Sequence, residues 1–125
     1  IICEYYCEVK RFMPELPEVE TIRSQLSHYL PFRVESLSTT PELKQNILHT
    51  ELGIKSKTLV EIRRKGKMLD FIFDDGSHLL SHLGMTGTWL VGESIKSGKH
   101  THLILKSKTH TLAYDDPRRF GHMYY

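Results

Sequence analysis

The first strongly patterned segment of the chain has apolar residues at the spacing of one helical face. These positions are Val19, Ile22, Leu26, Tyr29 and Leu30. Pro17 stands where a first helical turn tolerates a missing N–H. Glu18 and Glu20 fall where the helix dipole favours negative charge, and Pro31 cannot continue a helix. The pattern therefore predicts one helix over about residues 17–30.

Downstream of Pro31 the pattern changes to short strands separated by turn residues. Residues 67–73 and 78–83 flank residues 74–76 (Asp-Asp-Gly), which are typical of a tight hairpin turn. The other strand candidates are residues 33–39, 58–64, 86–91, 102–105 and 111–114. Residues 92–100 have the composition of an exposed loop. We therefore expect an α+β, mainly β fold: a two-sheet antiparallel β-sandwich with the N-terminal helix packed on it and room for a second short helix.

Size and composition fit one globular domain. The chain has 125 residues, of which 39% are hydrophobic and 26% charged, which supports a packed core and excludes a disordered or collagen-like chain. No apolar run is long enough to span a bilayer, and residues 1–10 lack the apolar stretch of a secretion signal, so we expect neither a membrane nor an export role. Cys3 and Cys7 have no second pair with which to complete a zinc site, and free thiols in a reducing cytoplasm are expected.

Positive charge is concentrated in the second half of the chain. Residues 1–62 contain 7 Lys and Arg against 9 Glu, a net charge of −2, whereas residues 63–125 contain 10 Lys and Arg against 6 Asp and Glu, a net charge of +4. The second half also contains 6 of the 8 His. This asymmetry suits a polyanionic partner, although a solvated basic face accounts for it as well.

Residues 13–15 (Met-Pro-Glu) offer a nucleophile. If translation starts at Met13, the small residue that follows favours removal of the Met, and Pro14 then carries a free secondary amine. An α-amino group has a pKa of roughly 7.7–8.0, so part of it is neutral at pH 7. Such an amine can attack a sugar C1′ and form an iminium ion, with Glu15 transferring the proton. The alternative is that Pro14 and Pro17 only begin a helix.

A second group of candidates is the run Arg-Arg-Lys-Gly-Lys at residues 63–67. Four cations at the start of an apolar strand suit a phosphate clamp, and Lys67, nearest the strand, suits a catalytic cation. A solvated charge run is the alternative.

Histidines and a basic loop form a third group. His100 and His102 would share one face of a strand, which makes a metal site worth considering. Residues 116–121 (Asp-Pro-Arg-Arg-Phe-Gly) are better explained by DNA, because Arg pairs with phosphates or base edges and Phe wedges between stacked bases.

Five blocks of the sequence resemble the bacterial formamidopyrimidine-DNA glycosylase family. The blocks are PELPEVET at 14–21, IRRKGK at 62–67, LLSHLGMTG at 79–87, KHTH at 99–102 and DDPRRFG at 115–121. They occur in the family's order over residues 13–125, and five collinear blocks make a chance match very improbable. The resemblance implies the family's N-terminal catalytic domain, which is a two-sheet β-sandwich with flanking helices.

The resemblance also implies a function. Members of this family remove oxidised purines, such as 8-oxoguanine and formamidopyrimidines, from damaged duplex DNA and then cleave the strand at the abasic site. We therefore expect a base-excision repair enzyme that acts as a monomer in the bacterial cytoplasm, at the nucleoid and not at a membrane.

The roles of the site residues are implied position by position. Pro14 matches the Schiff-base nucleophile, Glu15 its acid/base partner, and Lys67 the lysine that assists base loss and elimination. The residues expected to bind DNA are His82, His100, Arg118 and Arg119. The residues that match those filling the gap left by a flipped-out nucleotide are Met85, Arg118 and Phe120.

The sequence departs from the family at three places. The match does not include the helix–two-turn–helix module or the zinc finger, so we expect weak binding of damaged DNA and little or no turnover by this chain alone. We also expect no cofactor in this chain, since the family's zinc would bind in that finger. Residues 1–12 lie outside the family pattern and are expected to be an upstream mis-start, because a peptide bond on the Pro14 nitrogen blocks the amine. Thr101 stands between two histidines where the family often has an acidic residue.

Two alternatives to an active glycosylase remain at this stage. One is a non-catalytic DNA-binding module derived from the same family. The other is a small metal-binding protein that uses His82, His100 and His102.

Overall fold

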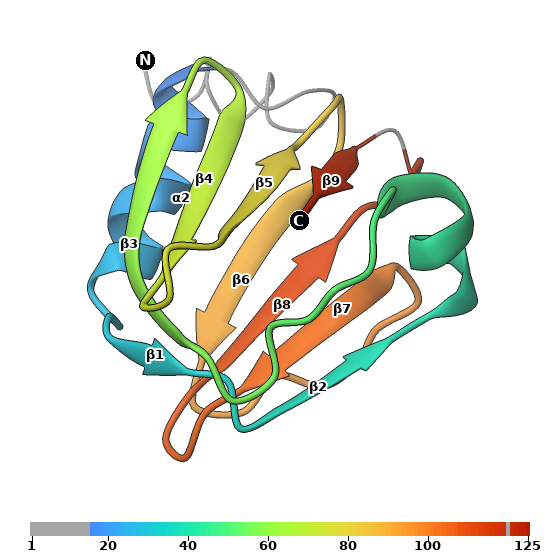
Figure 1. Ribbon diagram of the computed structural model, residues 1–125. Helices are drawn as coiled ribbons and strands as arrows, with labels where there is room; N and C mark the ends of the chain where they lie inside the picture. Colours follow the sequence, from blue (N-terminus) through green and yellow to red (C-terminus); the bar gives the residue numbers. More distant parts are fainter. Residues whose placement is uncertain (1–15, 120) are drawn as a thin grey trace.

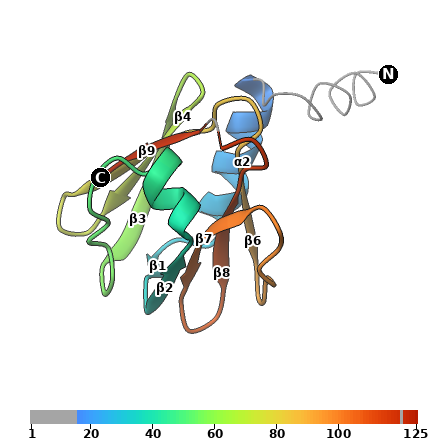
Figure 2. The same cartoon turned by 90° about the vertical axis from the view of Figure 1, so that its right-hand side faces the viewer.

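Two antiparallel sheets stack face to face in the computed structural model, which describes residues 16–119 and 121–125 (Figure 1). Helix α2 (Leu16–Ser27) lies along one side of the sandwich and the short π-helix η1 (Leu43–Ile47) along the other. Figure 2 shows η1 in front, with the two sheets on either side of it and α2 behind. The strands are β1 (Phe32–Arg33), β2 (Ser36–Thr39), β3 (Thr58–Lys65), β4 (Met68–Phe73), β5 (His78–His82), β6 (Thr88–Gly92), β7 (Thr101–Lys106), β8 (Thr111–Asp115) and β9 (His122–Tyr124).

The predicted β-sandwich is confirmed. One sheet has five strands in the order β1-β3-β4-β5-β9 and the other has four in the order β2-β7-β8-β6. Every neighbouring pair of strands is antiparallel. The β4–β5 hairpin has the predicted turn, in which the Gly76 N–H donates to the Phe73 carbonyl at 3.0 Å and Gly76 has a φ of +85°.

The core lies between the sheets and is closed at its sides by the two helices. Alternate residues of β4 point inward, and Val19 and Leu26 of α2 are buried against them. The Trp89 indole N–H of one sheet donates to the Ser81 hydroxyl of the other at 3.1 Å, so the buried polar groups also join the two layers. Trp89 packs on Phe71, with ring centroids 4.9 Å apart. Neither helix in the described part of the chain is long and apolar enough to cross a membrane.

Helix α2 is shorter than the pattern predicts, ending at Ser27 rather than near residue 30. The N–H groups of His28, Tyr29 and Leu30 bond to carbonyls three residues earlier, so the chain tightens into a turn. Apolar periodicity continues through this turn because Leu30 packs against the core, whereas Pro31 rules out a further helical turn.

Residues 33–39 are not one strand but parts of two. The chain changes sheets at Val34 and Glu35, whose N–H groups donate to the carbonyls of Lys57 and Lys106 respectively. Strand β1 therefore pairs with β3 and strand β2 with β7. Strand β9 was not predicted from the sequence, since it has only three residues and is held by its pairing with β5.

Candidate functional site

The predicted site residues that the structure describes lie mainly in three turns at the upper end of the sandwich in Figure 1, beside the start of α2. These are the β3–β4 turn, the β5–β6 turn and the β8–β9 loop. Pro14, Glu15 and Phe120 lie outside the described residues. The first described residue, Leu16, begins α2 and follows Glu15 directly.

Lys67 lies half-buried in the β3–β4 turn. Gly66, just before it, has a φ of +59°, a left-handed conformation that glycine adopts without strain. The Lys67 carbonyl accepts a hydrogen bond from the Leu83 N–H at 3.5 Å. This contact places Lys67 next to the turn that carries Met85.

Met85 is the tip of the β5–β6 turn and is 39% exposed. The turn is closed by a 2.9 Å hydrogen bond from the Gly87 N–H to the Leu83 carbonyl. A Cβ on Gly87 would lie 2.5 Å from the Tyr114 hydroxyl oxygen and 2.6 Å from the Leu83 carbonyl oxygen, so only glycine fits. An apolar side chain held outward by such a fixed turn is suited to enter a stack of bases.

The fully buried carboxylate of Asp116 accepts four hydrogen bonds. Its Oδ1 accepts from the Thr86 hydroxyl at 2.6 Å and the Arg119 N–H at 3.0 Å. Its Oδ2 accepts from the Tyr114 hydroxyl at 2.8 Å and the Gly121 N–H at 2.9 Å. Burial, together with the Asp116 charge, raises the pKa of the Tyr114 phenol well above its ordinary value, so the phenol remains a donor. Asp116 therefore organises both the Met85 turn and the β8–β9 loop.

The β8–β9 loop presents two arginines at the surface. Arg118 and Arg119 are both exposed, and the Arg118 N–H donates to the Thr86 hydroxyl oxygen at 3.4 Å. Arg119 has a φ of +57°, which is uncommon for a residue other than glycine. The loop backbone is thus fixed while both guanidinium groups face solvent.

The three histidines considered as metal ligands lie in different surroundings. The expectation that His100 and His102 share a strand face is wrong, because β7 begins after His100, which is exposed, whereas His102 is buried. Both ring nitrogens of His102 are in use, Nδ1 with the Thr40 hydroxyl at 3.1 Å and Nε2 with the Asp116 carbonyl at 3.0 Å. His82 is exposed at the end of β5, and its Nδ1 accepts the Gly84 N–H at 3.1 Å. Across residues 16–119 and 121–125 no three His, Cys, Asp or Glu side chains are grouped as metal ligands would be.

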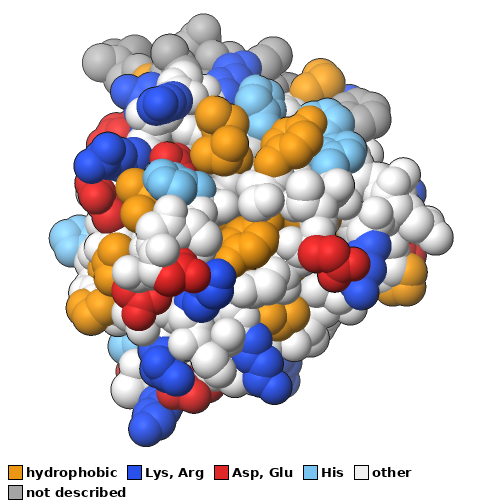
Figure 3. Space-filling view, viewed as in Figure 1, with side chains coloured by type: hydrophobic (Ala, Val, Ile, Leu, Met, Phe, Trp, Pro, Cys, Tyr) orange, Lys and Arg blue, Asp and Glu red, His pale blue; other side chains and the backbone are white. Residues whose placement is uncertain are grey.

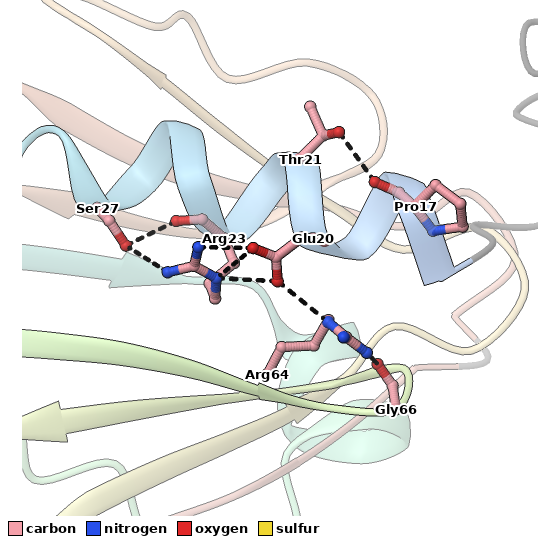
Figure 4. Close-up of polar contacts among 7 residues, drawn as sticks. All are labelled: Pro17, Glu20, Thr21, Arg23, Ser27, Arg64 and Gly66. Carbon is pink, nitrogen blue, oxygen red and sulfur yellow. Dashed lines mark hydrogen bonds and ion pairs between the residues drawn. The ribbon is translucent and has the colours of Figure 1, made fainter.

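The Glu20 carboxylate joins α2 to the β3–β4 hairpin (Figure 4). It accepts from Arg23 Nη2 at 2.6 Å and from Arg64 Nε at 3.1 Å, and Arg64 Nη1 donates to the Gly66 carbonyl at 3.3 Å. These hydrogen bonds, first that from Arg23 and then that from Arg64, lower the pKa of Glu20 to about 2. An ionised clamp therefore links the helix that follows the predicted nucleophile to the turn that carries Lys67.

A cavity of about 280 Å³ lies between α2 and β6, beside the Met85 turn. Glu18 and Thr21 line it from the helix, and Thr86 and Trp89 line it from the other side. Its volume is near the lower end of small-molecule pockets, roughly 300 Å³. Polar side chains and an indole ring thus surround a space between α2 and the end of the β5–β6 turn.

The sequence patterns did not point to the polar groups that hold these turns. Asp116, Tyr114 and Thr86 were not singled out, and neither was the Glu20–Arg64 pair. The glycines on either side of Met85 were the available signal, since they mark a place where the backbone comes close to another group.

The chain is similar to the N-terminal part of known DNA glycosylases. A family model described as the formamidopyrimidine-DNA glycosylase N-terminal domain matches residues 13–123. The formamidopyrimidine-DNA glycosylase of Solibacter usitatus is 37% identical over 115 residues, covering 87% of this chain and 42% of that protein. That of Rickettsia felis is 35% identical over 120 residues, covering 90% of this chain and 42% of that protein. The chain therefore spans about two-fifths of the length of these curated relatives.

Solved structures with the same fold are complexes with DNA. One is the wild-type Lactococcus lactis protein Fpg (MutM) with DNA containing an oxidised pyrimidine, at 32% identity and a TM-score of 0.78, covering 89% of this chain and 43% of that one. Another is MutM with DNA containing carbocyclic 8-oxo-G, at 32% identity and a TM-score of 0.80, with the same coverage.

Proposed function

This chain belongs to the formamidopyrimidine-DNA glycosylase family, and from this premise we propose that it contributes the catalytic domain of a base-excision repair enzyme. The enzyme removes oxidised purines, such as 8-oxoguanine and formamidopyrimidines, from duplex DNA and cleaves the strand at the resulting abasic site. It acts as a monomer in the bacterial cytoplasm, on nucleoid DNA.

The reaction requires Pro14 to be the first residue of the mature chain. Its secondary amine bonds to C1′ of the damaged nucleotide as the glycosidic bond breaks, and the base leaves with the bonding electrons and a proton. Loss of the amine proton and opening of the sugar ring, with protonation of the ring oxygen, give an iminium ion. Removal of a C2′ proton then expels the 3′ phosphate. Glu15 transfers protons in these steps.

Lys67 assists base loss and elimination. Its backbone contact with Leu83 and the Glu20–Arg64 clamp support this role, because together they link its turn to the start of α2. A cation next to the sugar stabilises the negative charge that develops on the leaving group.

DNA binding uses the exposed groups at the same end of the fold. His82, His100, Arg118 and Arg119 contact the DNA backbone. Met85, and Arg118 in a second role, enter the duplex where the nucleotide has been extruded. Phe120, outside the described residues, directly follows Arg119 in the sequence and acts with Met85 and Arg118. The cavity between α2 and β6 receives the extruded base.

The observation that carries this proposal is the joint anchoring of Met85 and Arg118 on Asp116. Two groups suited to entering DNA come from turns far apart in the sequence and are tied together through Thr86. An exposed apolar tip and an exposed cationic tip, held at a fixed separation, are the combination that entry into a DNA duplex needs.

Borohydride trapping tests the chemistry. A chain beginning at Pro14 should form a covalent adduct with abasic-site DNA, because borohydride reduces the iminium ion to a stable amine. Pro14→Gly should slow trapping strongly while leaving DNA binding nearly unchanged. The same chain with Met13 retained is the matched control, since its Pro14 nitrogen is an amide and should give no adduct.

One observation favours a second function, a DNA-binding module without catalysis. In the sequence as given, a peptide bond joins Met13 to Pro14, and an amide nitrogen cannot form an iminium ion. DNA binding without trapping, even when Pro14 is terminal, would support this second function, whereas no DNA binding would contradict both.

A further inference from the structure

Three aromatic rings are stacked on the outer face of the five-stranded sheet, in a group that the proposed catalytic machinery does not use. His49 stacks on His122, with ring centroids 5.1 Å apart and planes 26° apart, and on Tyr124, at 4.9 Å and 21°. All three residues are exposed, Tyr124 at 47%. We call His49, His122 and Tyr124 the ring platform. Figure 3 shows histidines on either side of hydrophobic side chains in the upper part of this face.

The ring platform rests on a fixed backbone. Leu48 forms a parallel bridge with Met123, and the His49 N–H donates to the Met123 carbonyl at 3.0 Å. Both Leu48 and Met123 are buried in the core. The rings therefore have a defined position before any partner binds, which lowers the entropy cost of binding.

The ring platform is continuous with the proposed DNA interface. His122 is the direct cross-strand partner of His82 in the β5–β9 pair. Side chains of directly opposed residues point to the same face, with Cβ atoms about 4.5–5.5 Å apart. Lys44, from η1, lines the same hollow as His49 and adds a cation, although Glu51 lines that hollow too.

The histidine pair always presents a hydrogen-bond donor outward. His49 Nε2 and His122 Nδ1 lie 2.9 Å apart, so one of them donates to the other. In a neutral imidazole the accepting ring carries its proton on the other nitrogen, so the accepting ring has an N–H that points away from the pair. Whichever tautomer is present, one N–H remains for a ligand, and a phosphate oxygen is a fitting acceptor. The ring faces suit a deoxyribose or a base.

We propose that the ring platform is a secondary DNA-binding surface. It contacts the sugar-phosphate backbone of the DNA strand that His82 binds, at nucleotides further along that strand. This inference rests on the proposed function and extends its footprint. Neighbouring strands are about 4.8 Å apart, and the His122–His49 stack adds 5.1 Å. The sum of about 10 Å corresponds to about three nucleotides at a rise of ~3.4 Å each.

The test compares duplexes of different length. The affinity of the full chain is measured for a long duplex with a central abasic-site analogue, and for duplexes shortened by three base pairs on one side or the other. The variants are His49→Ala combined with His122→Val, and Tyr124→Leu alone. His28→Ala is the matched control, because His28 is an exposed histidine in the turn that follows α2 and belongs to no strand of this sheet. Thermal melting verifies that each variant is folded.

Loss of one hydrogen bond to a charged phosphate should weaken binding of the long duplex about tenfold in the double variant. Shortening the duplex on one side of the abasic-site analogue should weaken its binding to the original chain. The same shortening should change its binding to the double variant little. Unchanged affinity in folded variants would overturn the inference and leave the proposed function intact. Failure of the original chain to bind any duplex would overturn both. Sedimentation compares the oligomeric state of the original chain with that of the variants. If the original chain were a dimer and the variants were monomers, the inference would be overturned in favour of an interface between two copies.

Discussion

The hydroxyl group of Thr86 lies 2.6 Å from the carboxylate of Asp116, which is 30 residues later in the chain. The same hydroxyl oxygen accepts the Arg118 N–H at 3.4 Å, and the same carboxylate oxygen accepts the Arg119 N–H at 3.0 Å. One pair of short polar side chains therefore fixes the distance between the Met85 turn and the β8–β9 loop. Because the Asp116 carboxylate is fully buried, its position depends on the hydrogen bonds that the surrounding donors supply.

Asp116→Asn should destabilise the protein by about 2–3 kcal/mol. All four groups around the carboxylate are donors, and an amide replaces one acceptor oxygen with an NH₂ group that faces donors. Two of the four donors then lose their acceptor. Urea unfolding at neutral pH measures the change.

Asp115→Asn is the matched control for that experiment. The Asp115 Oδ1 is buried, and no hydrogen-bond partner for it exists among the residues that the structure describes. Replacing this carboxylate should therefore leave stability unchanged or raise it slightly. Equal losses in both variants would show that the Asp116 hydrogen bonds are not what holds the loop.

Gly121→Ala should also destabilise the fold, by about 1–3 kcal/mol. A Cβ at this position would overlap the Tyr114 hydroxyl oxygen and lie 2.9 Å from the His82 carbonyl oxygen. Gly98→Ala is the comparison, because its Cβ would meet only the Thr101 hydroxyl oxygen, at 3.5 Å. The midpoint of thermal unfolding should fall in the first variant and stay near that of the original chain in the second.

Local patterns predicted the elements of this fold well where one face of an element is buried. The helix that begins near Pro17 and the hairpin around Gly76 follow from periodicity and turn chemistry. The change of sheets at Val34 did not follow, because it depends on hydrogen bonds to Lys57 and Lys106, which are distant in the sequence. Strand β9 is too short to have a pattern of its own.

The surface residues of the site were easier to predict than the groups that hold them. Arg118 and Met85 belong to short blocks that resemble a known family, and the structure leaves both exposed. His102 belongs to such a block too, but its ring is buried between Thr40 and Asp116. Whether a polar residue faces solvent or an internal partner depends on long-range packing, which a linear pattern does not contain.

Glu20→Gln should reduce stability in a pH-dependent way. The hydrogen bonds from Arg23 and Arg64 hold the pKa of Glu20 at about 2 in the folded chain, below the ordinary value of 4.5. Its contribution is therefore fully present above about pH 4.5 and is lost as pH falls toward 2, since the unfolded chain takes up the proton first. Urea unfolding at pH 7, 4 and 2.5 should show the gap between the two proteins closing with acid. A difference in unfolding free energy that stays constant with pH would mean that the clamp contributes nothing as an ion pair. Arg64→Met, which removes one partner of Glu20, should make the unfolding free energy less dependent on pH than in the original chain.

Lys67→Met should slow trapping on DNA that still carries the damaged base by about 100-fold or more, the usual scale for a positioned proton-transfer group. Lys65→Met removes an exposed cation two residues earlier, at the end of β3, and is the matched control. It should alter affinity slightly and the trapping rate hardly at all. Single-turnover trapping at saturating protein separates the two effects. Equal reductions of the trapping rate in both variants would mean that the β3–β4 hairpin acts only through its total charge.

Arg118→Ala separates two roles that the same side chain has been given. If its guanidinium pairs with a phosphate, the variant should reduce the slope of log affinity against log salt concentration by about 1, because one fewer counterion is released. If it fills the gap left by the extruded nucleotide, affinity should fall by the same factor at every salt concentration. Arg33→Ala is the control. Arg33 is an exposed arginine that forms an ion pair with Glu35. It belongs to β1, which lies at the opposite end of the sandwich (Figure 1). We expect a reduced slope for Arg118→Ala and an unchanged slope for Arg33→Ala in titrations from low to physiological salt. An unchanged slope with weaker binding would assign Arg118 to the gap alone and leave the backbone contacts to Arg119 and the histidines.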